Sequence, residues 1–131
     1  MRIPKGFTTV TPCFCVDGAE TFAAFLKSAF GGVEIGRSLR ADGRIANVQV
    51  RIGTSTVMAS EASGKYPAMH TAYYLYVEDA GKTMEQALRS GAKLEMEVGD
   101  MPYGDRQGGV VDPCGNIWWI SQRLVDEAYF E

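Results

Sequence analysis

Thr11-Pro-Cys-Phe-Cys-Val16-Asp17-Gly18 is a short apolar segment that runs directly into an amphipathic helical pattern ending at Gly31. About sixty residues later, Thr71-Ala-Tyr-Tyr-Leu-Tyr-Val77-Glu78-Asp79 leads in the same way into a second helical pattern, which ends at Gly91. Each copy then continues into strand-like segments. Because self-similarity at such an offset is the mark of an internal repeat, the sequence predicts a duplicated module of strand, helix and strands.

The two helices are predicted from apolar spacing and from the residues at their ends. In the first, Asp17 is the expected N-cap, with Glu20 three residues later as in a capping box. In the second, Asp79 is the expected N-cap and Gly91 the stop. The predicted buried faces are Phe22, Phe25, Leu26, Ala29 and Phe30 in the first helix, and Ala80, Met84, Ala87 and Leu88 in the second.

The remaining segments predict strands and turns. Alternating apolar and polar residues over 45–52, after the Asp42-Gly43 turn, indicate the second strand of a half-buried hairpin whose first strand is residues 33–40. Residues 61–69 lack periodicity and are the expected linker between copies. Asp112-Pro113-Cys114-Gly115 has turn chemistry and a structural meaning. The other predicted strands are residues 55–60, 93–98, 106–111 and 116–122.

Composition indicates one compact domain over residues 1–131, with module 1 at about 7–60 and module 2 at about 70–123. The chain is 46% hydrophobic, carries a net charge of −3 and has no run of Lys or Arg, so nucleic acid is not an expected partner. No segment resembles a signal peptide or a membrane span. The three cysteines are an odd count, which favours reduced thiols. We therefore expect a cytoplasmic protein with no membrane partner.

The ordered set of motifs resembles the vicinal oxygen chelate superfamily, which includes glyoxalase I, the fosfomycin and bleomycin resistance proteins and the extradiol dioxygenases. Within it, the chain looks most like the PhnB-like proteins. The motifs are Val16-Asp17-Gly18, Val77-Glu78-Asp79, Asp42-Gly43-Arg44-Ile45, Arg51-Ile52-Gly53, Tyr103-Gly104-Asp105-Arg106 and Asp112-Pro113-x-Gly115-x-x-Trp118. The resemblance implies an α+β fold of two βαβββ modules, whose curved sheets form a half-open barrel around a cavity, usually completed as a homodimer.

The resemblance also locates the positions of a metal site. In metal-dependent members, the first and last strands of each module each supply one His, Gln or Glu ligand. The corresponding residues here are Thr11, Met58, Ala72 and Trp119, and none of them is a strong ligand. We therefore predict no metal cofactor. A two-residue slip would bring His70 onto the face of Ala72, so a divalent metal held by residues such as His70 and Glu61 is the alternative.

Strand parity predicts the residues that line the cavity. If Thr11 and Trp119 face inward, so do Cys13, Met58, Tyr74 and Tyr76, while Asn47 and Gln49 face away from the apolar core. Tyr103 and Arg106 are expected near the mouth, where Arg106 can bind an anion. Their alternative role is to stabilise the loop through Asp105. The predicted ligand-binding set is Thr11, Cys13, Asn47, Gln49, Met58, Tyr74, Tyr103, Arg106 and Trp119.

Three functions remain open from the sequence. The first is a metal-independent protein that binds a small aromatic or anionic molecule in an aromatic, amide-lined cavity. The second is a glyoxalase- or dioxygenase-type enzyme whose divalent metal has non-standard ligands, and the third is a dimeric scaffold. With one histidine in the chain, no Ser/His/Asp set can be assembled. The sequence therefore identifies no catalytic residue.

Overall fold

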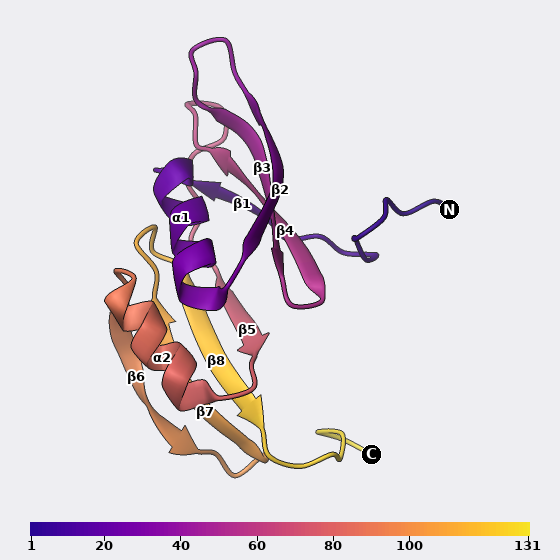
Figure 1. The fold of residues 1–131 in the computed structure, drawn as a ribbon, viewed down its shortest axis with the longest axis vertical. Helices are drawn as coiled ribbons and strands as arrows, with labels where there is room; N and C mark the ends of the chain where they lie inside the picture. Colours follow the sequence, from indigo (N-terminus) through magenta and orange to yellow (C-terminus); the bar gives the residue numbers. More distant parts are fainter. The chain divides into compact units, whose positions relative to one another are not determined.

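The computed structural model describes residues 1–131, which form two compact units, Met1–His70 and Thr71–Glu131. We call them module 1 and module 2. Each contains a strand, a helix and three further strands, as Figure 1 shows. The elements are β1 (Cys13–Val16), α1 (Ala19–Phe30), β2 (Val33–Leu39), β3 (Ile45–Ile52), β4 (Ser55–Glu61), β5 (Ala72–Tyr76), α2 (Ala80–Arg89), β6 (Lys93–Asp100), β7 (Asp105–Val111) and β8 (Ile117–Arg123).

The two sheets have the same topology. Module 1 has the strand order β1-β4-β3-β2, and module 2 has the corresponding order β5-β8-β7-β6. In each, the first strand pairs in parallel with the last, and the other pairs are antiparallel. The matching strand order and pairing of the two sheets confirm the predicted α+β fold and the two βαβββ modules.

Each module has its own apolar core between its helix and one face of its sheet. In module 1, Phe22 and Leu26 of α1 are fully buried against a face that includes Val48 and Val50. In module 2, the corresponding buried residues are Ala80, Met84 and Ala87 of α2 with Val110, Trp118 and Ile120. Fully burying each large apolar side chain contributes about 1.5–3 kcal/mol. Leu88 was predicted in this core but is 40% exposed, because the buried stripe of α2 consists of Ala80, Met84 and Ala87 and Leu88 lies outside it.

The helix N-termini differ from the sequence prediction in one case. Asp79 caps α2 as predicted, with its carboxylate accepting the backbone N–H of Lys82 at 3.0 Å. Asp17 does not cap α1, because the N-cap is Gly18 in a left-handed conformation, with φ of 95°. The cap comes instead from Glu61 at the end of β4, whose carboxylate accepts the N–H groups of Gly18 at 3.0 Å and Ala19 at 2.9 Å.

Module 2 has an equivalent contact across its sheet. The side-chain oxygen of Gln122, near the end of β8, accepts the N–H of Ala80 at 3.0 Å. The last strand of each module therefore supplies a side chain that satisfies the start of that module's helix. These contacts join residues more than forty positions apart, so local capping patterns do not show them.

The Asp112 turn is structural, as predicted. One carboxylate oxygen of Asp112 accepts the N–H groups of Cys114 and Asn116, and the other accepts the indole N–H of Trp118 at 2.8 Å. The turn thus anchors the start of β8.

No helix in either module is long and apolar enough to cross a membrane.

Candidate functional site

The sheet of module 2 has one face covered by α2 and one open face. Gly108 faces the helix, because a Cβ placed there would meet the sulfur and methyl group of Met84. Its neighbours point the other way: a Cβ on Gly109 would meet the ring of Trp119, and the Gln107 amide donates to Ser121 Oγ at 2.7 Å. The open face therefore carries Tyr74, Tyr76, Asp105, Gln107, Gly109, Trp119 and Ser121, by strand register.

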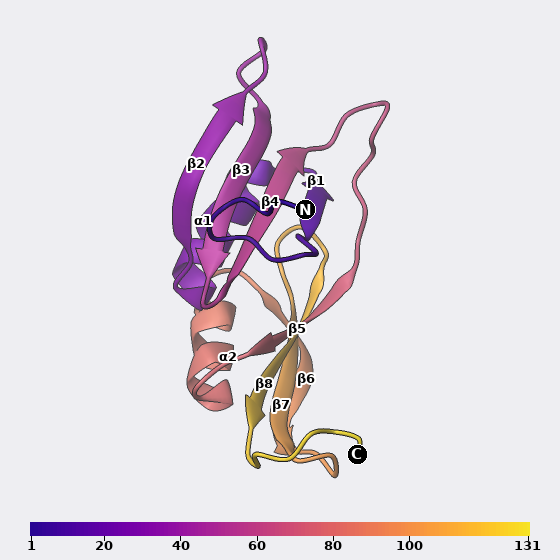
Figure 2. The same cartoon turned by 90° about the vertical axis from the view of Figure 1, so that its right-hand side faces the viewer.

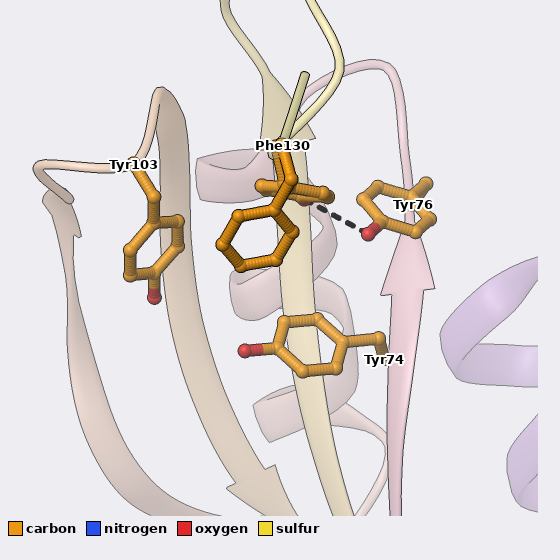
Figure 3. Close-up of a pocket in the computed structure, with 5 residues that line it drawn as sticks. Tyr74, Tyr76, Tyr103 and Phe130 are labelled. Atoms are coloured by element: carbon orange, nitrogen blue, oxygen red, sulfur yellow. Dashed lines mark hydrogen bonds between the residues drawn. The ribbon is translucent and has the colours of Figure 1, made fainter.

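A pocket of about 360 Å³ lies on this open face and is lined by aromatic residues alone. Figure 3 shows the rings of Tyr74, Tyr103 and Phe130 arranged around it. Tyr74 and Tyr76 come from β5, Tyr103 from the loop between β6 and β7, and Tyr129 and Phe130 from the C-terminal segment after β8. Exposed aromatic side chains gathered in one patch are typical of binding surfaces.

A chain of hydrogen bonds fixes one side of the pocket. The Tyr129 hydroxyl donates to the buried carboxylate of Asp105. The hydroxyls of Tyr76 and Tyr129 lie 2.8 Å apart, the bond dashed in Figure 3. Since the proton of Tyr129 is directed to Asp105, Tyr76 is the donor to Tyr129. The bond to Asp105, with the smaller contribution of Tyr76, raises the pKa of Tyr129 well above its usual range.

Arg123 holds Asp105 and both flanks of the pocket. Its guanidinium lies 2.9 Å from the Asp105 carboxylate, donates to the carbonyl of Tyr103 at 2.7 Å and also donates to the carbonyl of Glu127. The same group lies over the ring of Tyr129, 4.2 Å from its centre. A buried carboxylate requires a partner of this kind, because an unpaired buried charge is strongly unfavourable.

The opposite side of the pocket is fixed through Tyr103. Its hydroxyl donates to the side-chain oxygen of Gln107, whose amide in turn donates to Ser121. Burial, with a smaller contribution from Tyr74, raises the pKa of Tyr103. Both fixed tyrosines are therefore neutral near pH 7, and the pocket offers aromatic faces and hydroxyl groups without a charged side chain in its lining.

The structure places three of the predicted site residues on this face. Tyr74 and Tyr103 line the pocket, and Trp119 lies on the same face, next to Tyr74 in strand register. Arg106 does not join them. It alternates with Asp105 and Gln107 and pairs with Asp100 at 2.7 and 3.3 Å. The Asp105 contact that was its alternative role is made by Arg123.

Module 1 carries the other predicted residues. Cys13, Gln49 and Met58 lie on the face opposite α1, where Met58 is registered with both of the others. Asn47 shares this face and accepts a hydrogen bond from the Gln49 amide at 3.2 Å. Asn47 and Gln49 border a hollow of about 270 Å³, and Cys13 borders one of about 260 Å³. Thr11 precedes β1, which begins at Cys13.

The side chains present do not fit a divalent metal site within either module. No three His, Cys, Asp or Glu side chains gather closely enough to hold an ion. Glu61, one of the alternative ligands, has both carboxylate oxygens bonded to backbone N–H groups of α1. These bonds lower its pKa, with the N–H of Gly18 contributing most.

Sequence reasoning missed the C-terminal part of the site. Tyr129 and Phe130 follow the last predicted strand, where periodicity carries no information about contacts. Asp105 and Arg123 were not assigned as a pair, because their contact depends on the register between β7 and β8. The only local signal was the pair of adjacent aromatic residues near the end of the segment.

Two duplicated βαβββ modules, each with one helix-covered and one open sheet face, define a glyoxalase-like protein. The family model described as "Glyoxalase/Bleomycin resistance protein/Dioxygenase superfamily" matches residues 8–120. The chain belongs to this superfamily, as the resemblance of its motifs implied.

The chain is also similar to individual proteins in sequence or in fold. An uncharacterized protein of Mycobacterium bovis is 31% identical over 124 residues, covering 86% of this chain and 82% of that protein. A PhnB protein from Bacillus cereus matches in fold, with a TM-score of 0.64, 14% identity and coverage of 88% and 99%. TnmS3, an antibiotic binding protein from Streptomyces sp. CB03234, matches with a TM-score of 0.67, 18% identity and coverage of 88% and 97%.

Proposed function

We propose that this protein binds a small, flat, uncharged aromatic molecule on the open face of module 2, without a metal cofactor. The observation that carries the proposal is the pocket lined by five aromatic residues from three separate segments. Its volume lies within the range of drug-sized ligand sites, which are mostly apolar with a few polar groups. The antibiotic-binding protein of the same fold is consistent with this function.

The chemistry of the lining supports binding more than turnover. Aromatic rings stack with a flat ligand, and tyrosine hydroxyls offer hydrogen bonds to its carbonyl or hydroxyl groups. The carboxylate bonded to the pocket residue Tyr129 belongs to Asp105, which is buried and also bonded to Arg123. An acid and base pair positioned for reaction is not part of this arrangement. The three free cysteines fit a cytoplasmic location, which we include in the proposal.

The test is a binding titration with uncharged aromatic probes in the presence of a chelator. We expect saturable binding of N-phenyl-1-naphthylamine, detected by its fluorescence, at one probe per chain. Tyr74→Ala and Tyr103→Ala each remove a ring from the pocket. Each is expected to raise the dissociation constant roughly tenfold, which corresponds to about 1.4 kcal/mol of binding free energy.

The matched control is Tyr66→Ala, because Tyr66 is also an exposed tyrosine but lies in module 1. We expect this variant to bind the probe like the wild type. Equal losses in all three variants, or binding that disappears when the chelator is added, would contradict the proposed site.

A further inference from the structure

The C-terminal segment, residues 124–131, follows β8 and lies on the side of the module 2 sheet away from α2 (Figure 2). Its start is fixed to the loop before β7, because the N–H of Leu124 donates to the carbonyl of Gly104 at 2.9 Å. A Cβ on Gly104 would meet the Val125 side chain at 2.9 Å, so this loop and the segment are also in close contact. The segment is therefore fastened to the sheet from its first residues.

Further along, a single residue carries three separate contacts. The Tyr129 hydroxyl bonds to Asp105 and to Tyr76, and its ring lies under the guanidinium of Arg123. Arg123 also holds the carbonyl of Glu127, two residues earlier in the segment. A buried carboxylate is strongly unfavourable unless it is paired, so Asp105 depends on its contacts with Arg123 and Tyr129. The same contacts fix the position of the segment.

Phe130 follows this anchored residue and has the opposite character. Its side chain is 90% exposed although it lines the pocket. A large apolar ring held beside an aromatic pocket gains buried area when a flat ligand enters. Tyr129 thus fixes the position from which Phe130 can cover a ligand.

We propose that the C-terminal segment is a wall of the binding site, in which Phe130 contacts the aromatic ligand directly and Asp105 and Arg123 act as positioning residues through Tyr129. The proposal rests on the proposed function, since it concerns the same pocket. It adds that selectivity for a flat, uncharged ring comes from the part of module 2 that follows its last strand, β8. The ligand then lies between Phe130 and the rings on β5.

Three variants separate contact from positioning. Phe130→Ala removes the ring and leaves the anchor intact. Tyr129→Phe keeps the ring beneath Arg123 and removes both hydroxyl bonds, and Asp105→Asn removes the charge that holds the anchor. Asp100→Asn is the matched control, because it breaks the neighbouring pair with Arg106, whose side chain does not line the pocket.

Two measurements are made on the full chain: the dissociation constant for N-phenyl-1-naphthylamine, and amide hydrogen exchange of residues 124–131. We expect Phe130→Ala to weaken probe binding about tenfold with unchanged exchange. Tyr129→Phe and Asp105→Asn are expected to weaken binding and to accelerate exchange in the segment. Asp100→Asn should do neither. If Asp105→Asn does not fold, Tyr129→Phe still tests positioning, because its ring is retained.

The outcomes distinguish this inference from the proposed function. If the dissociation constants of both Phe130→Ala and Tyr129→Phe stay within twofold of the wild-type value, the inference is overturned and the proposed function stands. Wild-type protein that fails to bind the probe would contradict the proposed function. In that case, unchanged amide hydrogen exchange of residues 124–131 in Tyr129→Phe would also show that the Tyr129 hydroxyl does not hold the segment in place.

Discussion

Asp112 shows how much one buried carboxylate stabilises this fold. It accepts hydrogen bonds from the backbone of Cys114 and Asn116 and from the indole of Trp118. Replacing it with alanine leaves these donors without an acceptor in a buried region. We expect Asp112→Ala to lower the free energy of unfolding by about 2–4 kcal/mol, measured by urea denaturation.

The control for this measurement is Asp42→Ala. Asp42 also accepts a backbone N–H two residues along the chain, from Arg44 at 2.9 Å, but in an exposed turn. Its loss is expected to change stability by no more than about 0.5 kcal/mol. Equal effects at the two positions would show that the indole bond and the burial of Asp112 contribute little.

Glu61 gives a second prediction at this scale, in the dependence of stability on pH. Its folded pKa lies below the ordinary value of 4.5, mainly because the Gly18 N–H bonds the charged carboxylate. A lowered folded pKa means that the stabilisation is fully present above pH 4.5 and is lost as the pH falls through the folded value. Glu61→Gln is therefore expected to lower stability by about 1 kcal/mol at pH 7.

The measurement is urea denaturation at pH 7 and at a series of values below 4.5. The difference between wild type and Glu61→Gln should shrink as the pH falls. Gln122→Ala is the comparison, because the equivalent cap of α2 comes from a neutral side chain. Its effect should not vary over this range, and a difference for Glu61→Gln that stays constant with pH would contradict a charge-based cap.

At the scale of elements, β7 carries two adjacent glycines with different neighbours. A Cβ on Gly109 would lie 2.6 and 2.7 Å from two ring carbons of Trp119, and this rigid ring can make room only by moving as a whole. A Cβ on Gly108 would meet the flexible end of Met84, and also Val98, at 2.9 Å. We expect Gly109→Ala to be destabilising by about 1–3 kcal/mol and Gly108→Ala by less.

Thermal unfolding compares the stabilities of the two variants, and tryptophan fluorescence reports where the strain goes. Gly109→Ala should change the emission of Trp119, since the ring must move on the open face. It should also weaken probe binding, because Trp119 neighbours Tyr74 in register. Normal stability and emission in Gly109→Ala would mean that the close approach of strand and ring has no role.

The elements themselves could be predicted well because their signals are local. The alternation in residues 45–52 gave β3 with the same bounds, and the apolar spacing gave α1 with its end at Gly31. Contacts between distant residues could not be predicted in this way. The cap from Glu61, the Asp105–Arg123 pair and the position of Tyr129 depend on strand register and on the path of the C-terminal segment.

The candidate site was predicted in part for the same reason. Strand parity placed Tyr74 and Trp119 on the open face, since a period of two decides the direction of each side chain. Arg106 was expected near the mouth, at the start of a strand over residues 106–111, because a guanidinium can bind an anion. Strand β7 begins at Asp105, and its alternation places Asp105 and Gln107 on the open face, so Arg106 points away from that face and pairs with Asp100.

At the scale of the whole molecule, the chain leaves apolar edge residues uncovered. Val33, Ile35 and Leu39 lie on β2, an edge strand of module 1, and each is more than half exposed. Exposed apolar edges favour pairing with another chain and are usually covered in solution. We propose that the protein forms a homodimer, as the resemblance implies, and that this edge strand contributes to the interface.

Native mass spectrometry of protein purified without added metal tests the dimer and the metal-free proposal together. We expect a species at twice the 14.3 kDa chain mass without a stoichiometric divalent ion. Ile35→Glu places a charge on the exposed edge and is expected to favour the monomer, whereas Leu94→Glu, on the edge strand of module 2, is the control. A stoichiometric ion in every chain would contradict the metal-free proposal. It would also require metal ligands other than a cluster of His, Cys, Asp or Glu side chains within one module, since neither module has such a cluster. A dimer that persists in Ile35→Glu would place the interface elsewhere. An added organic mass that is lost in Tyr74→Ala would identify a ligand of the aromatic pocket.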